Sequence, residues 1–250
     1  MDRISAATEI RSALYGGDLF VEYLPVISLE DNRCVGAEAL VRWRRELHVV
    51  PPIEFIPLIE NTPLSGLVTY WVIDTVAQEL AAWMRATEGL HIGINVPPEV
   101  FGRGGLEYAA AKARVLDIAY KFVLEITERG VPDKLGVEAL NARPRDSVLV
   151  ALDDVCASET SLLVLSQVRV DIVKIDKSCV AQLIPGWSPQ SMSALRDFMR
   201  SACGAVIAEG VETRAQLDIL RNAGIEMAQG WYFSHPLPAL EFMAYFAAHQ

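Results

Sequence analysis

Cysteine and histidine are scarce in this 250-residue sequence, and neither is spaced as a metal site would require. The four cysteines form no Cys-x-x-Cys pair, which argues against a structural zinc site and predicts reduced thiols. The four histidines show no paired spacing either, which excludes a histidine-rich metal phosphohydrolase. Gly-x-Ser-x-Gly, Walker-type and Gly-x-Gly-x-x-Gly motifs are also absent. Serine hydrolases, nucleoside triphosphatases and dinucleotide-dependent reductases therefore lack support.

Basic charge and long apolar runs are lacking as well. Acidic residues outnumber basic ones by 32 to 22, and the net charge of −10 disfavours non-specific binding to DNA, RNA or anionic membranes. No uninterrupted apolar run approaches ~20 residues, so no membrane segment is expected. The opening residues, Met1-Asp-Arg-Ile-Ser5, are no signal peptide. We therefore expect a cytoplasmic protein or the cytoplasmic domain of a larger one.

Short apolar runs alternate with longer helical patterns along almost the whole chain. We predict strands at 19–27, 34–41, 91–96, 122–127, 148–154, 172–176, 205–211 and 226–231. We predict helices at 65–84, 106–119, 133–141, 161–168, 189–203, 213–223 and 238–248. Alternating elements indicate an α/β protein with a parallel sheet, and eight strands favour a (β/α)8 TIM-type barrel. No linker divides the chain, so residues 1–250 are predicted to form a single barrel domain.

The connection between the first two predicted strands departs from the regular pattern. Only residues 28–33 separate them, which is too few for a crossover helix. The first strand is therefore expected to run antiparallel to the rest of the barrel.

Acidic and amide side chains interrupt the apolar strands near their carboxyl ends. The fifth predicted strand ends in the adjacent residues Asp153 and Asp154, whose burial must be offset by a basic partner, by protonation or by a metal ion. Seven successive strands carry such polar residues: Glu38, Asn95, Glu125, the Asp153–Asp154 pair, Lys174, Glu209 and Gln229. Because the carboxyl ends of parallel strands form one rim of a barrel, we predict that these side chains gather into a single site.

The donor types in this set indicate a hard divalent cation. Carboxylate and amide oxygens favour one or two ions of Mg²⁺ or Mn²⁺ over zinc. Two such ions about 3.5–4 Å apart suit phosphodiester hydrolysis. Lys174 should stay protonated among carboxylates, and acting as a base would require metal ions to offset the negative field of those carboxylates.

Arg42 is either a phosphate ligand or a surface residue of the basic run Arg42-Trp-Arg-Arg45, and both interpretations stay open.

The residues Glu38-Ala-Leu40, within Gly36-Ala-Glu-Ala-Leu-Val-Arg-Trp43, resemble the motif that names the EAL domain family of cyclic di-GMP phosphodiesterases. The resemblance covers nearly the whole chain, and the further motifs follow in the family's order. They are Tyr23-Leu-Pro-Val26, Phe55-Ile-Pro-Leu-Ile-Glu60, Leu124-Glu-Ile-Thr-Glu128, Leu152-Asp-Asp154, Val173-Lys-Ile-Asp176, Ala208-Glu-Gly-Val-Glu-Thr213, Ala228-Gln-Gly230 and Pro236-Leu-Pro238. Such an ordered set is far more specific than the three letters alone.

This resemblance implies a barrel with a reversed first strand and metal-dependent hydrolysis of cyclic di-GMP to linear pGpG in bacterial second-messenger signalling. It implies one ion held by Glu38, Asn95, Glu125 and Asp153, and a second served by Asp153, Asp154 and Glu209. The implied catalytic residues are Lys174, as general base or water-orienting group, together with Glu209 and Gln229. Arg42, Asp176 and Pro236 would bind substrate. Glu128 would anchor the loop that follows the Asp-Asp motif.

That loop departs from the family pattern, which reads approximately Asp-Phe-Gly-Thr-Gly-Tyr-Ser-Ser. Cys156 and Ser158 replace its two glycines, so a backbone with φ > 0 becomes costly there. Leu24 replaces a glutamine of the first strand, which removes a polar substrate contact. Because the loop positions the second metal's aspartate in the family, we expect hydrolysis that is slow or regulated.

The family pattern also allows two kinds of protein partner. The loop after the Asp-Asp motif contributes to homodimers in the family, and an upstream sensory or GGDEF-type domain would supply the input signal. The alternative to an enzyme is a cyclic di-GMP receptor or scaffold with weak or no catalysis.

Overall fold

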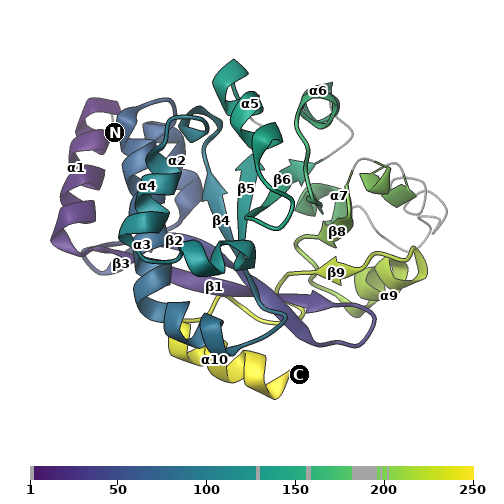
Figure 1. Ribbon diagram of the computed structural model, residues 1–250. Helices are drawn as coiled ribbons and strands as arrows, with labels where there is room; N and C mark the ends of the chain where they lie inside the picture. Colours follow the sequence, from purple (N-terminus) through teal and green to yellow (C-terminus); the bar gives the residue numbers. More distant parts are fainter. Residues whose placement is uncertain (1–2, 128–129, 156–158, 182–195, 198, 202) are drawn as a thin grey trace.

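Eight strands close into a barrel in the computed structural model, which describes residues 3–127, 130–155, 159–181, 196–197, 199–201 and 203–250 (Figure 1). The strands are β1 (Leu19–Ser28), β2 (Cys34–Arg45), β4 (His91–Val96), β5 (Phe122–Thr127), β6 (Leu149–Val155), β7 (Ile172–Ile175), β8 (Ala205–Ala208) and β9 (Met227–Ala228). Their order is β1-β9-β8-β7-β6-β5-β4-β2, and β1 also pairs with β2 to close the ring. The (β/α)8-type fold predicted from the sequence is confirmed.

The antiparallel first strand is confirmed too. β1 runs antiparallel to both of its neighbours, β2 and β9, whereas the other pairings within the barrel, from β2 with β4 to β8 with β9, are parallel. The hairpin opposes Leu24 to Glu38 and Phe20 to Arg42. The far end of β2 extends into a second hairpin with the short strand β3 (His48–Val50), which the sequence analysis did not predict.

Helices surround this barrel (Figure 1). They are α1 (Arg3–Gly16), α2 (Pro52–Ile59), α3 (Pro63–Ala86), α4 (Gly105–Lys112), α5 (Lys134–Ala142), α6 (Glu159–Gln167), α7 (Lys177–Ala181), α9 (Arg214–Asn222) and α10 (Ala239–Ala248), with the 3-10 turns η1 (Pro98–Val100) and η2 (Leu116–Lys121). None of the helices among the described residues combines the length and the apolar character that crossing a bilayer would need.

The helix predictions were wrong at several places. The helix expected at 106–119 is two elements, α4 and η2, because Arg114 has a left-handed backbone with φ 57° that ends the first one. The short helices α2 and α7 and the N-terminal helix α1 were not predicted. Pro52 begins α2, at a position where the missing backbone N–H of proline costs no helical hydrogen bond. Most of the helix expected at 189–203 lies outside the described residues.

The barrel interior has an apolar layer on the amino side of the predicted site. Its buried members are Val26, Val123, Ala151, Ile172 and Ile207. Four of them precede a polar residue of the site by two positions: Val123 and Glu125, Ala151 and Asp153, Ile172 and Lys174, and Ile207 and Glu209. Since residues two apart in a strand face the same way, the apolar layer closes the barrel directly beneath the polar one.

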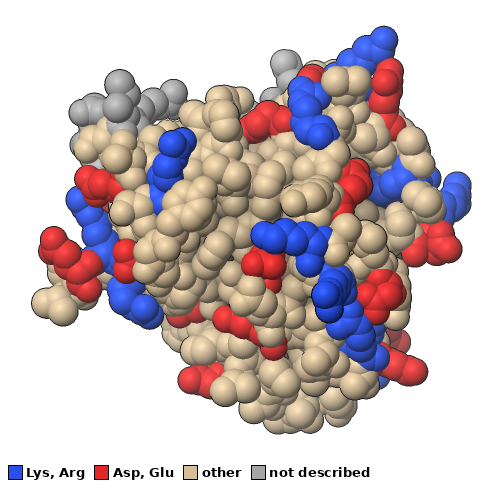
Figure 2. Space-filling model, turned by 60° about the vertical axis from the view of Figure 1, so that its left-hand side comes forward, with Lys and Arg blue, Asp and Glu red and all other residues tan. Residues whose placement is uncertain are grey.

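Charged side chains of both signs are interspersed on the outside of the molecule. On the face shown in Figure 2, lysines and arginines lie among aspartates and glutamates around a broad uncharged area. Among the described residues on this face, the charges therefore form no continuous basic surface of the kind that binds nucleic acid non-specifically.

Gly36 permits the close approach of β2 and β4. A Cβ atom added there would lie 2.2 Å from the backbone oxygen of His91, its partner in the sheet. We predict that Gly36→Ala lowers the free energy of unfolding by about 1–3 kcal/mol, because two backbones must separate. Thermal or urea unfolding checks this against Gly16→Ala, where the added carbon meets only a side-chain atom at 3.4 Å. Equal stability of the two variants would contradict the prediction.

Candidate active site

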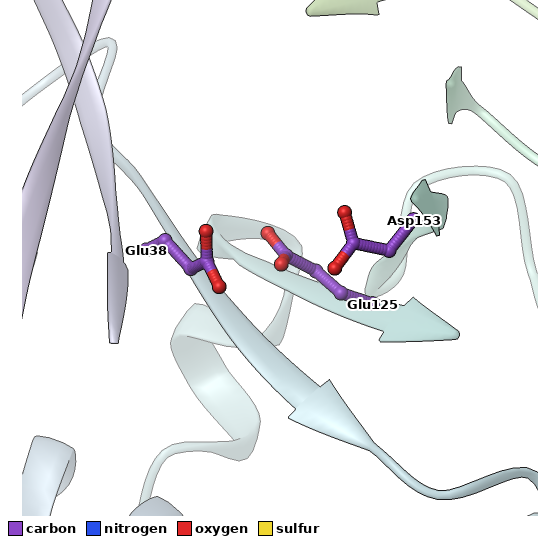
Figure 3. Close-up of side chains that lie close together, drawn as sticks. All are labelled: Glu38, Glu125 and Asp153. Atoms are coloured by element: carbon purple, nitrogen blue, oxygen red, sulfur yellow. The ribbon is translucent and has the colours of Figure 1, made fainter. Parts of the chain in front are cut away.

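Carboxylates from four strands of the barrel converge in its interior. Glu38 lies on β2, Glu125 on β5 and Asp153 on β6, and the three side chains point toward one another in Figure 3. They are only 7%, 4% and 6% exposed. Glu209 follows the last residue of β8 and brings a fourth carboxylate to the same place. The parallel strands thus gather the acidic residues as the sequence analysis expected.

Lys174 of β7 lies at the centre of these carboxylates. Its ammonium nitrogen lies 2.7 Å from Glu125, 2.8 Å from Glu209, 3.0 Å from Asp153 and 3.1 Å from Glu38. The residue is 1% exposed. One buried cation therefore faces four acidic groups, and the polar layer carries excess negative charge wherever these groups are ionised.

Two amide side chains complete the hydrogen bonding of Glu38. Gln229, which follows β9, donates from Nε2 to Glu38 Oε2 at 2.6 Å and to Glu209 Oε1 at 2.8 Å. Asn95 of β4 donates from Nδ2 to Glu38 Oε1 at 2.8 Å. Both oxygens of Glu38 are thus engaged by donors. Gln229 Oε1, by contrast, is buried and accepts no hydrogen bond from the described residues.

Burial disfavours the charged forms of three of these carboxyls. It raises the pKa of Glu125 and of Glu209 well above the ordinary range, although the nearby Lys174 ammonium acts in the opposite direction. Burial, aided by the charge of Glu38, also raises the pKa of Asp153. Without a bound cation, burial therefore favours the protonated forms of these three carboxyls.

Glu38 and Lys174 are shifted toward their charged forms. Burial is the largest influence on the pKa of Glu38 and raises it, but Lys174, Gln229 and Asn95 together bring that pKa below its usual value. For Lys174, burial lowers the pKa, and the four surrounding carboxylates outweigh it and raise the pKa well above that of a free lysine. The expectation that Lys174 stays protonated therefore agrees with the direction of its pKa shift.

The carboxylates fit a divalent cation. Two groups offer oxygens within 4.8 Å of one another, Glu38 with Glu125 and Asp153, and Asp153 with Asp154 and Glu209. Asp153 belongs to both groups. Its Oδ1 is buried without a well-directed hydrogen bond, although the Lys174 ammonium is 3.0 Å away. An oxygen-only donor set with such an atom suits Mg²⁺, Mn²⁺ or Ca²⁺ better than softer metals.

The backbone at Asp154 is irregular near the end of β6, where the register with β7 shifts between Leu152 and Val155. Its φ of 55° lies in the left-handed region, which Asp adopts more readily than most residues with a Cβ atom. This irregularity allows consecutive aspartates to serve one cluster, whereas a regular extended strand would direct them to opposite faces.

The predicted substrate-binding residues occupy separate places around the mouth. Arg42 Nε donates to Glu22 Oε2 of β1 at 2.9 Å. Asp176 follows β7 and accepts from the backbone N–H of Ser178 at 2.8 Å. Pro236 precedes Leu237, whose backbone pairs with that of Tyr23. The predicted loop anchor Glu128 and the replaced loop positions Cys156 and Ser158 lie outside the described residues.

Two residues of the site were missed by the sequence analysis, Glu22 and Gly93. A Cβ atom at Gly93 of β4 would lie 2.1 Å from Glu125 Oε1, so the missing side chain leaves room for that carboxylate. A glycine inside a strand is a general sign of such close approach and could have indicated this. No comparable sequence signal identifies Glu22, because its significance depends on its partner across the hairpin.

The chain resembles known proteins along almost its full length. A family model described as "EAL domain" matches residues 7–236. A probable cyclic di-GMP phosphodiesterase of Escherichia coli, PdeB, is 31% identical over 251 residues, which cover 96% of this chain and 47% of that protein. The chain spans about half the length of the curated relatives it matches first.

Solved structures of the same kind share the fold. The EAL enzyme Bd1971 with cAMP and cyclic di-GMP bound has a TM-score of 0.87 and 25% identity, over 98% of this chain and 69% of the other. The complex of the phosphodiesterase PaMucR with c-di-GMP has a TM-score of 0.82 and 26% identity, over 95% of this chain and 99% of the other.

The raised pKa values of Asp153, Glu125 and Glu209 predict a pH-dependent response to metal. These carboxyls bind protons more tightly in the folded than in the unfolded state, so their contribution to metal-free stability is present at low pH and is lost as the pH rises through the folded pKa values. A cation competes with those protons. We expect Mn²⁺ to raise the melting temperature more at pH 8 than at pH 5.5, as measured by scanning calorimetry. An equal increment at both pH values would contradict this.

A second prediction concerns the space above Gly93. Gly93→Ala should displace Glu125, because the added carbon would lie 2.1 Å from its carboxylate oxygen. We expect Mn²⁺ affinity, measured by titration calorimetry, to fall about 10–100-fold, the usual cost of misplacing a metal's supporting groups. Gly66→Ala on α3 is the control, since its new carbon has only ordinary contacts at 3.6 Å. Unchanged affinity in Gly93→Ala would show that this glycine does not position Glu125.

Proposed function

Because the chain belongs to the EAL domain family, we propose that it hydrolyses one phosphodiester bond of cyclic di-GMP to give linear pGpG. The observation that carries the proposal is the buried polar layer in which Asp153 belongs to two groups of metal-binding carboxylates. Phosphodiester hydrolysis is helped by divalent cations in such a place, since they offset the negative charge of the phosphate and bind the attacking water.

The residues that would hold metal follow from the two carboxylate groups. Glu38, Asn95, Glu125 and Asp153 would hold one ion, and Asp153, Asp154 and Glu209 would serve a second. When bound, Mg²⁺ or Mn²⁺ would offset phosphate charge and lower the pKa of a coordinated water. Asn95 would contribute its carbonyl oxygen, because its amide nitrogen already donates to Glu38.

Lys174 acts in this proposal as a hydrogen-bond donor. Its pKa is raised by four carboxylates, so it holds its proton in the arrangement described. A protonated ammonium can orient the attacking water or stabilise phosphate charge, but it cannot accept the water's proton. We therefore favour the water-orienting role over the general-base role.

The side-chain amide of Gln229 has its nitrogen held by hydrogen bonds, and its oxygen can accept one more. Its Nε2 is held by Glu38 and Glu209, which sets the orientation of the amide. The opposite atom, Oε1, is buried and unbonded among the described residues, so it can accept a hydrogen bond from the attacking water. The apolar layer beneath excludes further water from below and strengthens these interactions.

The substrate would enter from the mouth of the barrel. Arg42 would bind a phosphate there, and Asp176 and Pro236 would line the remaining approach. We propose that residues 1–250 form one catalytic domain of a cytoplasmic protein. Because the chain spans about half the length of its relatives, regulation by a sensory or GGDEF-type domain, or by homodimerisation through the loop after Asp154, is part of the proposal.

Asp153 offers the sharpest test, since both carboxylate groups share it. Asp153→Asn should reduce the rate of pGpG formation by at least about 100-fold with either Mg²⁺ or Mn²⁺, because a neutral amide binds a divalent cation poorly. Product is followed by chromatography. Glu88→Gln, an exposed change of the same kind in the connection before the amino end of β4, is the control and should retain full activity.

The outcomes separate the enzyme from a receptor. Metal-dependent product from the wild type that disappears in Asp153→Asn supports hydrolysis. Tight binding of cyclic di-GMP without product under either metal would instead establish the receptor alternative. Neither binding nor product would overturn the proposed function.

A further inference from the structure

Glu22 and Arg42 face each other on the inner wall of the barrel mouth. Val21 and Tyr23 of β1 pack in the hydrophobic core outside the barrel, as Trp43 of β2 does in a second cluster beneath α1 and α2. Side chains alternate along a strand, so Glu22 and Arg42 face the interior. Arg42 lies four residues beyond Glu38 on the same face, about 13 Å farther out at 3.3 Å per residue.

The pair is partly buried and has a defined geometry. Arg42 Nε lies 2.9 Å from Glu22 Oε2, and the two side chains are 14% and 27% exposed. Arg42 Nη1 also donates to the backbone oxygen of Val41 at 3.1 Å. A guanidinium has five N–H donors, so these two bonds fix its orientation and leave three donors, including both of Nη2, for another partner.

Glu22 is well placed to impose this orientation. It is the only charged residue in β1, whose ten residues read Leu-Phe-Val-Glu-Tyr-Leu-Pro-Val-Ile-Ser. The register places it across from Leu40, between the pairs of Phe20 with Arg42 and Leu24 with Glu38. The antiparallel direction of β1 is what brings a residue near the start of that strand to the same end of the barrel as the end of β2.

We propose that Glu22 is a positioning residue for Arg42: it holds the guanidinium so that its Nη2 edge faces a phosphate of the substrate above the carboxylate layer. This inference rests on the proposed function, because it assigns the phosphate to cyclic di-GMP. Holding Arg42 in advance reduces the side-chain entropy lost on binding, which otherwise weakens affinity. Glu22 acts through Arg42 and does not touch the reacting atoms.

The experiment compares two changes at Glu22. Glu22→Ala removes the acceptor for Arg42 Nε, whereas Glu22→Gln keeps an oxygen that can accept the same hydrogen bond. We expect Glu22→Ala to raise KM for cyclic di-GMP about five- to tenfold, with kcat nearly unchanged, as loss of one hydrogen bond of typical net strength predicts. Glu22→Gln should restore KM to near the wild-type value.

Two controls make the result specific. Glu9→Ala breaks another ion pair to β2, in which Arg45 lies 2.7 Å from Glu9 of α1, and should leave both kinetic constants unchanged. In an Arg42→Ala background, Glu22→Ala should have no further effect on KM, because the residue through which it acts is gone.

Several outcomes would overturn the inference. An unchanged KM in Glu22→Ala would show that the ion pair does not position Arg42. A lower KM in both Glu22 variants would show that Glu22 competes with the phosphate. If Glu22→Ala raises KM as much in the Arg42→Ala background as in the wild type, its effect does not pass through Arg42. A wild type that neither binds nor hydrolyses cyclic di-GMP would overturn the proposed function together with this inference.

Discussion

The contact between the Lys174 ammonium and four buried carboxylates is the constraint on which the site depends. A single lysine cannot offset four acidic groups inside a protein, and burial accordingly raises the pKa of three of them. The fold nevertheless holds these groups together, because each projects from a strand whose outer face packs in the core. The unbalanced charge is best explained by a function that brings in divalent cations.

The barrel supports this layer from below. Apolar residues two positions before Glu125, Asp153 and Glu209 on the same strands fill the interior on the amino side of the carboxylates. The reversal of β1 adds something a fully parallel barrel would lack. It places one acidic residue of β1, Glu22, beside Arg42 at the mouth, where an ion pair with defined geometry lies above the charged layer.

Much of this arrangement could be predicted from the sequence. Short apolar runs identified all eight barrel strands, and the brief connection after β1 predicted its direction, because both depend on local pattern and chain length. Glu38, Glu125, Asp153 and Glu209 could be grouped because the carboxyl ends of parallel strands meet. The pairing of Arg42 with Glu22 could not be predicted from the sequence, since it depends on the register of the hairpin. Helix α2 was not predicted, because it is only eight residues long and its packing through Phe55 and Ile59 depends on the tertiary structure.

The central claim is that the buried carboxylate layer is a divalent cation site, and crystals grown with Mn²⁺ test it most directly. The account predicts anomalous scattering from manganese bound to Asp153, with Glu38 and Glu125 or with Asp154 and Glu209 as further ligands. Saturating Mn²⁺ with no manganese at Asp153, and with Lys174 still bound to all four carboxylates, would contradict it.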